Sequence, residues 1–504
     1  MGWFKNMIMK MLRITPAPES QIITIQEPYS YRANVLRNRL WYRGDPSELD
    51  QFYKQSVTDA VGKSRFWAAV PTAGLGIRKI HSGLPAMVAD RLSDIVIADM
   101  DAIALKAQAE TDTWEEISKD NDFPELLAGA VTEALTAGDG AFKVTVDPEV
   151  SEYPLIEFYS GDQVEYKRTR GRLLEVIFYT DYVFNSKDYR LLETFGRGYI
   201  RSKLLDDYGK EVPLSLVPET ATLAPEITYE GDFLMAVPLM VFKSTKWPGR
   251  GKSIFDSKAD SFDALDEVIS QWMDAIRSGR VQKYIPEDMI PKNPETGELM
   301  RPNPFDNQFI RINSTFAEDA KGQINLVQPQ ILYEAFVASY ASAVDMCLQG
   351  IISPSTLGID LKKTDNAEAQ REKEKATLYT RGKIVERLNE VIPELVATVM
   401  KVYDTMQGRK AAEYEPSVKF GEYASPSFDS VVETVGKART FGVMSVERSV
   451  EELYGDTWTE EEKAAEVQRL KEEQGLLEVD DPAINRDAPP DEDGNEDDPE
   501  EVEA

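Results

Sequence analysis

The sequence has very little of the two side chains that build most metal centres and many nucleophilic sites. Among its 504 residues there is one cysteine, Cys347, and one histidine, His81. A single cysteine excludes an intrachain disulfide, and one histidine without any CxxC pair cannot supply the usual ligand set of a zinc site. A Ser-His-Asp triad would need His81, yet the chain contains no nucleophile-elbow motif. We therefore interpret His81 as a hydrogen-bonded structural residue.

Complete glycine motifs that cradle phosphate groups are also absent. Two stretches resemble part of a Walker A loop, "VGKS" at 61–64 and "GRGKS" at 249–253, but Val57 and Lys246 stand where the first glycine is required. We predict no catalytic residue, no cofactor and no metal site, and hence a protein that is not an enzyme. The 88 acidic residues could still form a carboxylate site, so a nucleic-acid enzyme such as a carboxylate–metal nuclease is the alternative.

Positive charge is scarce too. Lys and Arg number 57 against 88 acidic residues, which gives a net charge of −31, and residues 451–504 alone carry 22 acidic and 4 basic side chains. The chain therefore lacks the basic footprint of a sequence-specific DNA-binding protein. No run approaches the roughly 18 apolar residues of a membrane span, so we expect no membrane partner. The N-terminal "MGWFKNMIMKMLRITP" predicts a helix that docks on protein, with a membrane-surface helix as the alternative.

The hydrophobic period changes along the chain. Up to about residue 140 the pattern is helical, and Asp45 followed by Glu48 predicts a capping box at one helix start. Over about 141–242 the period is two, and turn residues such as Arg170-Gly171 separate short strands. The sequence therefore predicts an α+β protein with an antiparallel meander.

Two apolar helices then flank a segment rich in proline and turns. The first, over about 256–280, places its apolar residues on one stripe, and the second spans 331–348. Brief strands are predicted between them at "FIRIN" and "QINLV". This pattern predicts a helical hairpin with a small β module at its tip.

A loop after Gly350 leads into a long helix that we predict from Asp365, its cap, to about Tyr403. Gly382 and Pro393 are expected to bend or break this helix. A further helical region precedes residues 480–504, whose acidic, proline-rich composition with few apolar side chains predicts disorder.

These segments, in this order, are similar to a known family. The resemblance rests on "LWYRGDPSELDQFY", the strand block that contains "QVEYKRTRGRLLEVIFY" and "YRLLETFGRGYI", the hairpin, "DNAEAQREKEKATLYTRGKI" and "GVMSVERSVEELYGDTWTEEEKAAEVQRLKEEQG". Together they cover most of residues 35–475. The chain resembles the portal proteins of tailed bacteriophages, of the type found in siphoviruses of Gram-positive hosts.

The resemblance implies a portal fold whose subunits assemble as a ring. Its regions would be a wing at 1–253, a first stem helix at 254–280, a clip at 281–329, a second stem helix at 330–349, a tunnel loop at 350–364, a long kinked wing helix with a return strand at 365–424, and a crown at 425–479. The acidic tail at 480–504 lies beyond the family's pattern, and we assign it no role at this stage.

The resemblance further implies a dodecameric ring at one capsid vertex, through which double-stranded DNA is packaged and ejected and on which procapsid assembly begins. The implied partners are further copies of the chain, the terminase large subunit, the head–tail adaptor, the major capsid protein and the scaffold. The implied location is the virion, after assembly in the host cytoplasm. A non-ring virion adaptor protein is a third alternative.

Two groups of residues would carry this role. The tunnel loop would meet DNA without sequence preference through Ser353, Ser355, Thr356, Asp360, Lys362, Lys363 and Thr364. The apolar stripe would pack between subunits through Phe262, Leu265, Ile269, Trp272 and Ile276. An ordinary solvated pair of surface charges is the other interpretation of Lys362 and Lys363.

Overall fold

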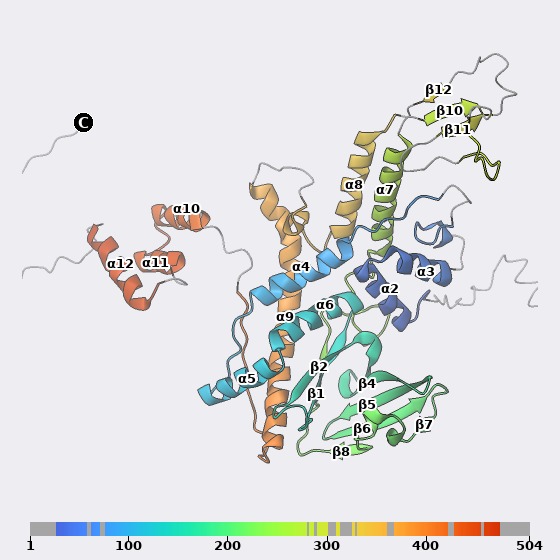
Figure 1. Ribbon diagram of the computed structural model, residues 1–504. Helices are drawn as coiled ribbons and strands as arrows, with labels where there is room; N and C mark the ends of the chain where they lie inside the picture. The colour runs from blue at the N-terminus through green and yellow to red at the C-terminus, as the bar shows by residue number, and fades with distance from the viewer. Residues whose placement is uncertain are drawn as a thin grey trace, which may run out of the picture. The chain divides into compact units, whose positions relative to one another are not determined.

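The computed structural model describes residues 27–57, 62–70, 76–279, 282–286, 290–300, 309–312, 325–327, 330–359, 367–421, 428–454 and 458–473. The chain divides into two compact units, Met1–Tyr423 and Ala424–Ala504 (Figure 1). Helices and antiparallel sheets both occur, as the α+β prediction requires. The predicted N-terminal helix, the cap at Asp365 and the acidic tail lie outside the described residues. Within those residues, no helix has the length and apolarity of a membrane span.

Five α-helices form the N-terminal part of the first unit. They are α2 (Tyr31–Arg43), α3 (Pro46–Ser56), α4 (Leu84–Ala98), α5 (Gln108–Asp120) and α6 (Phe123–Ala137). Asp45 caps α3 by accepting a hydrogen bond from the Ser47 backbone N–H. The predicted capping box is wrong in its second half, because Glu48 forms an ion pair with Arg43 at 2.7 Å. The helix start is therefore stabilised by one side-chain cap.

Two antiparallel sheets follow, as predicted. The smaller has the order β2-β1-β9, with β1 (Gly140–Thr145), β2 (Leu155–Ser160) and β9 (Ala236–Leu239). The larger has the order β3-β4-β5-β6-β7, and β8 pairs with β6; its strands are β3 (Val164–Thr169), β4 (Arg172–Phe184), β5 (Lys187–Gly196), β6 (Tyr199–Asp206), β7 (Glu211–Val212) and β8 (Glu226–Thr228).

The turns of the larger sheet use left-handed backbone. Arg170 and Gly171 have φ values of 51° and 80°, as a tight hairpin turn between β3 and β4 requires. The sequence analysis missed the next turn, where Asn185 and Ser186 have φ values of 51° and 58°. Short 3-10 segments among the described residues are η1 (Gly62–Ser64), η2 (Gly161–Gln163), η3 (Leu214–Leu216), η4 (Pro218–Thr220) and η7 (Pro354–Leu357).

The long helix α9 (Ala367–Met406) forms a large part of the core. Most of its apolar side chains from Ile384 to Val402 are almost fully buried and share one core cluster with α4, α6 and β1. The helix is continuous through Gly382 and Pro393, so no break occurs, and the expected bend stays a prediction. Pro393 removes the hydrogen bond to the carbonyl of Asn389, an exposed residue, where water can satisfy this oxygen.

The predicted hairpin is confirmed. Helices α7 (Ala259–Ser278) and α8 (Tyr333–Leu348) pack side by side, and strands β10 (Gln282–Pro286), β11 (Phe309–Ile312) and β12 (Asn325–Val327) lie beyond their far ends (Figure 1). The sheet order is β11-β10-β12. Strand β10 is parallel to β11 and antiparallel to β12. The tip is thus a small mixed sheet.

The second unit contains α10 (Phe428–Thr440), α11 (Val446–Tyr454) and α12 (Glu460–Glu473). Two ion pairs join α11 to α12, Glu447 with Lys471 at 2.6 Å and Glu451 with Lys463 at 3.1 Å. The rings of Tyr454 and Trp458 stack with centroids 3.9 Å apart. The unit begins at Ala424, next to residue 425, where the sequence resemblance implies the start of the crown.

Candidate functional site

The base of the helical hairpin is joined to the body by buried polar side chains of α7. Asp263, Asp266 and Ser270 lie on one face of this helix and are all buried. Asp263 accepts hydrogen bonds from the backbone N–H groups of Phe66 and Trp67, at 2.9 and 3.1 Å. Burial raises the pKa of Asp263, and these two backbone donors oppose that rise.

Asp266 is the centre of this network. Its side chain is fully buried and accepts hydrogen bonds from the Trp67 indole at 3.1 Å, from the His81 Nδ1 at 2.7 Å and from the Ser82 backbone at 2.9 Å. Because an ionised carboxylate only accepts, the Nδ1 atom of His81 carries the proton. The interpretation of His81 as a hydrogen-bonded structural residue is confirmed for Nδ1, whereas Nε2 is buried without a hydrogen-bond partner among the described residues.

Ser270 continues the same line of contacts, since its hydroxyl accepts from the Ile80 backbone N–H at 2.9 Å. Asp263, Asp266 and Ser270 lie one or two helical turns apart on α7. They therefore hold the described residues 66–70 and 76–82 along this helix. In the described part of the chain, no group of three or more His, Cys, Asp or Glu residues is arranged to hold a metal ion. These carboxylates thus fix the position of a helix.

Aromatic side chains hold α7 against α8 above this base. The Trp272 ring lies parallel to the Phe336 ring, with centroids 6.2 Å apart and an interplanar angle of 4°. Tyr333 and Tyr340 approach the same indole at centroid distances of 6.3 and 6.4 Å. Such pairs add roughly 0.5–1.5 kcal/mol each beyond area burial. The two helices therefore form a packed pair within one chain.

The predicted stripe divides into a covered part and an open part. Phe262 and Leu265 are buried in the chain's own core, and Ile269 and Trp272 are half-buried against it and against α8. The chain itself therefore covers Phe262 and Leu265 fully and Ile269 and Trp272 in part. Ile276 remains 44% exposed. Packing of the stripe between subunits stays a prediction, and Ile276 is the member with the most surface open to such a contact.

The outer surface of the hairpin is apolar and lacks positive charge along α8. Its exposed large apolar side chains are Met273, Ile276, Leu332, Tyr333, Val337 and Met346. Helix α8 has no Lys or Arg, and its only charged residues are Glu334 and Asp345. Together with Ile331, the exposed apolar side chains give the hairpin a surface that is rich in large apolar groups, and such surfaces are suited to contact with protein.

The first half of the predicted tunnel loop lies on α9. The Ser353 backbone N–H donates to Thr377 Oγ1 at 2.9 Å, and the Thr356 hydroxyl lies 2.9 Å from the same oxygen. Ser353 is buried, and its hydroxyl lies 2.7 Å from that of Ser355, which is exposed. Asp360, Lys362, Lys363 and Thr364 lie outside the described residues. The predicted DNA contact stays a prediction.

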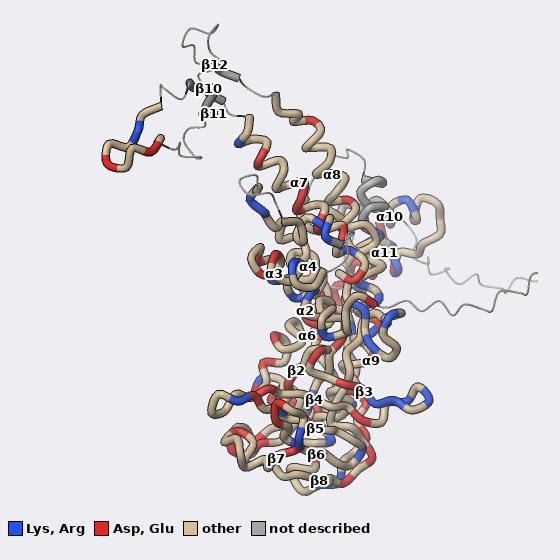
Figure 2. The backbone as a smooth tube through the Cα atoms, turned by 90° about the vertical axis from the view of Figure 1, so that its right-hand side faces the viewer, with Lys and Arg blue, Asp and Glu red and all other residues tan. Residues whose placement is uncertain are grey.

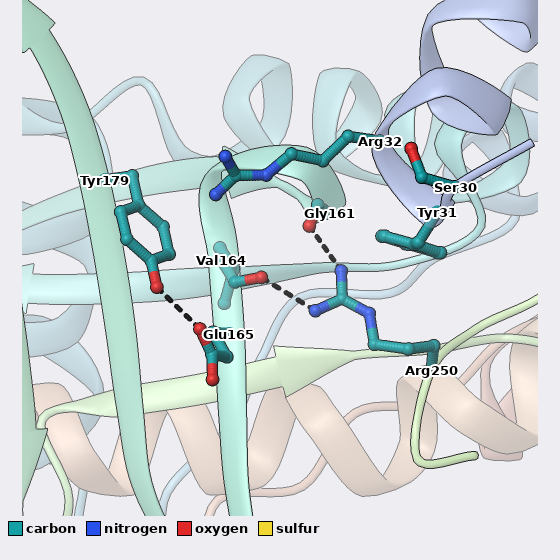
Figure 3. A pocket seen from close by; sticks show the side chains of 8 residues that line it. All are labelled: Ser30, Tyr31, Arg32, Gly161, Val164, Glu165, Tyr179 and Arg250. Atoms are coloured by element: carbon teal, nitrogen blue, oxygen red, sulfur yellow. Dashed lines mark hydrogen bonds between the residues drawn. The ribbon is translucent and has the colours of Figure 1, made fainter. Parts of the chain in front are cut away.

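A cavity of about 310 Å³ lies where the N-terminus of α2 meets η2, β3 and β4 (Figure 3). Arg250 points between these elements and donates to the carbonyl oxygens of Val164, at 2.7 Å, and Gly161. It also forms an ion pair with the buried Asp139 at 2.8 Å. Tyr179 donates to Glu165 at 2.6 Å. Arg250 therefore joins η2 to β3, and the bond between Tyr179 and Glu165 joins β4 to β3.

Comparison with known proteins gives only distant structural likenesses. No protein-family model and no curated protein matches the sequence. The neck of a native GTA particle computed with C12 symmetry is 13% identical, with a TM-score of 0.37, over 75% of this chain and 88% of that chain. The neck of an empty GTA particle computed with C6 symmetry is 14% identical, with a TM-score of 0.33, over 77% and 89%. At these values the likeness assigns neither a fold nor a function to this chain.

The sequence analysis did not identify the buried carboxylates. Asp266 carried a signal that could have identified it, because it stands within the apolar stripe between Leu265 and Ile269. A charge at a core-facing position is buried only when it is paired or hydrogen-bonded. Asp139 and Glu193 carry no comparable local signal, since their partners are distant in sequence.

Proposed function

We propose that this chain is a portal protein of a tailed bacteriophage, a subunit of a dodecameric ring at the capsid vertex. The observation that carries the proposal is the hairpin of α7 and α8. Buried carboxylates fix its base, aromatic contacts join its helices, and large apolar side chains remain exposed on its outer face. Neighbouring copies in a ring would cover these side chains and remove apolar surface from water.

The order of the elements supports the same role. A helical and antiparallel body leads into the hairpin with its β module, then into a loop, the long helix α9 and a separate helical unit. This is the order of regions that the sequence resemblance implies. The absence of Lys and Arg from α8 also suits a channel, because strong neutralisation of phosphate would slow the passage of DNA.

In this role the ring sits in the virion, binds the terminase motor during packaging and the head–tail adaptor afterwards, and contacts the major capsid protein and scaffold during assembly. DNA would pass without sequence preference. The work of translocation would be done by the terminase, so the chain itself needs no catalytic site.

The direct test is the mass of the assembled protein, by sedimentation and native mass spectrometry, with negative-stain images of the particles. We expect rings of about a dozen copies with a central hole. Val337→Asp on the exposed face of α8 should disrupt the rings, because it places a charge in an apolar contact. Val183→Asp is the matched control, because it places the same charge at an exposed position of β4 that is distant in sequence from α8. This variant should still give rings. A wild-type chain that stays monomeric at high concentration would overturn the proposal.

A further inference from the structure

The turn between β3 and β4 carries basic side chains that the proposed function does not use. Residues 167–172 read "KRTRGR", and this turn is dominated by Lys and Arg in Figure 2. Lys167 is neutralised by Glu175 at 2.7 Å. Arg168, Arg170 and Arg172 are exposed and form no ion pair with any described residue. Three unneutralised guanidinium groups on a chain of net charge −31 are an unusual concentration of positive charge.

The turn is a defined platform. Strands β3 and β4 stay paired up to Thr169 and Arg172, and the left-handed Arg170-Gly171 pair closes a tight hairpin. The Arg168 guanidinium lies over the Tyr166 ring, with 5.6 Å between its central carbon and the centroid. The register shifts between Lys167 and Arg168, but the strands stay paired on both sides of the shift. The arginines are therefore presented by paired strands, which limits the entropy lost when a ligand binds.

A second basic segment lies beside this turn. Gly249 lies close to Arg168, since a Cβ atom added at Gly249 would be 3.8 Å from the arginine Cδ. The loop that contains Gly249 is closed by a β-bridge between Lys243 and Gly251 and by a 2.8 Å hydrogen bond from Lys252 N to Phe242 O. Lys243 and Lys252 form no ion pair with the described residues. We define the basic patch as Arg168, Arg170, Arg172, Lys243 and Lys252.

The chain itself contains a strongly complementary segment. From Asp487 to Ala504 it has ten carboxylate side chains and no Lys or Arg. Guanidinium groups bind carboxylates through two parallel hydrogen bonds. The 31 residues after Glu473 could span up to roughly 100 Å when extended, and a tethered segment acts at a high effective concentration. A DNA duplex would instead meet a protein that is acidic over most of its sequence, which weakens that alternative.

We propose that the basic patch is the docking site for the acidic C-terminal segment, residues 480–504, of a second copy of this chain. The inference rests on the proposed ring, which places copies side by side. A ring also gathers the acidic segments of all copies, and repulsion between them favours the pairing of each with a positive surface. The contact is expected to be sequence-tolerant and sensitive to salt, because exposed ion pairs are screened.

The test uses a labelled peptide of residues 480–504 and the chain truncated after Val479, with binding followed by fluorescence anisotropy near physiological salt. Arg170→Gln/Arg172→Gln should weaken binding roughly tenfold. Lys187→Gln/Lys210→Gln removes two exposed charges from other turns of the same sheet and should leave the affinity unchanged. The full-length chain should bind the peptide more weakly than the truncated chain, because its own copies of the segment compete.

Equal affinity in the two double variants would overturn the proposal, and so would tighter binding of a short DNA duplex than of the peptide at the patch. A second measurement needs no variant. Wild-type protein assembled from ¹⁴N- and ¹⁵N-labelled chains is treated with a carbodiimide, and we expect cross-links of mixed isotope between Lys243 or Lys252 and carboxylates of residues 480–504. Unmixed cross-links alone would exclude a second copy. Ring mass is measured on the same samples, so failure of the docking and failure of the ring are separate results.

Discussion

The Nδ1 atom of His81 lies 2.7 Å from Oδ2 of Asp266, which stands 185 residues later on α7. The same carboxylate accepts from Trp67 and Ser82, so three donors from one segment converge on a single side chain of the hairpin. Buried polar groups that are fully bonded hold elements in a unique arrangement, and the loss of one partner leaves the others unsatisfied.

Asp266→Ala should therefore lower the free energy of unfolding by about 3 kcal/mol or more, because it leaves three buried donors without their acceptor. Denaturant unfolding followed by tryptophan fluorescence measures the change. Glu267→Ala, at the next position, removes a partly exposed carboxylate that accepts a hydrogen bond from Gln271, and should cost less than about 0.5 kcal/mol. Equal losses in the two variants would contradict the role assigned to Asp266.

The two antiparallel sheets are joined by another buried pair. Lys143 on β1 donates to Glu193 on β5 at 2.6 Å, and both side chains are buried. Lys143→Met leaves Glu193 buried and unpaired, so we expect a loss of about 3–5 kcal/mol. Lys143→Met/Glu193→Met replaces the pair with apolar groups and should recover most of that loss. Chemical denaturation of both variants measures their free energies of unfolding. A double variant no more stable than the single variant would refute the expected recovery.

The same pair predicts a dependence on pH. Burial lowers the pKa of Lys143, but the Glu193 and Glu157 carboxylates outweigh burial, so the pKa is raised above its ordinary value of 10.5. A lysine with a raised folded-state pKa stabilises the fold fully below its unfolded pKa, and this contribution is lost as pH rises through the folded value. The stability difference between wild type and the double variant should be constant from neutral pH to about pH 10 and should shrink above it. A difference that changes below pH 10 would assign the effect to another group.

The loop after Gly350 should depend on Thr377. Thr377→Val keeps the shape of this buried side chain but removes the acceptor of the Ser353 N–H, which should cost about 1–3 kcal/mol. The amide hydrogen-exchange rates of residues 351–359 should increase through local opening of this loop, without unfolding of the rest of the chain. Thr405→Val on the exposed end of α9 is the control and should leave exchange in this loop unchanged. Unchanged exchange in the Thr377 variant would show that the loop is held by other contacts.

The expected role of Lys362 and Lys363 can be measured with assembled particles. Changing both to Ala should leave ring assembly intact and reduce the length of packaged DNA, because the loop no longer steadies the duplex. Changing both to Glu should reduce it further through repulsion from phosphate. Packaged DNA per particle is compared at matched ring yield. The same length in all three proteins would return the two lysines to ordinary surface charges.

Local signals predicted the elements well. The apolar stripe from Phe262 to Ile276 identified α7, and Arg170-Gly171 identified a hairpin turn, because both depend on neighbours within a few residues. The Asn185-Ser186 turn was missed because neither residue is glycine, although both adopt left-handed backbone. The continuity of α9 through Pro393 was also missed, since core burial on both sides of the proline outweighs one lost hydrogen bond.

Long-range pairings were not predictable in the same way. Lys143 and Glu193 are 50 residues apart, and Arg250 and Asp139 are 111 apart. Each residue alone resembles any other surface charge in a chain with 88 acidic side chains. Their burial follows from the way in which sheets and helices meet, and a single sequence does not record that geometry. These two pairs were therefore the part of the fold that the sequence described least.

The bond between Trp67 and Asp266 spans 199 residues, and this has a consequence during synthesis. At roughly 5–20 residues per second, a ribosome needs about 10–40 seconds to make the chain between these two partners. Throughout that interval the indole of Trp67 and the nearby backbone amides have no acceptor from α7. Nascent chains of this protein should therefore expose residues 66–82 to chaperones until the hairpin emerges, and the body should reach its final form only after α7 leaves the exit tunnel.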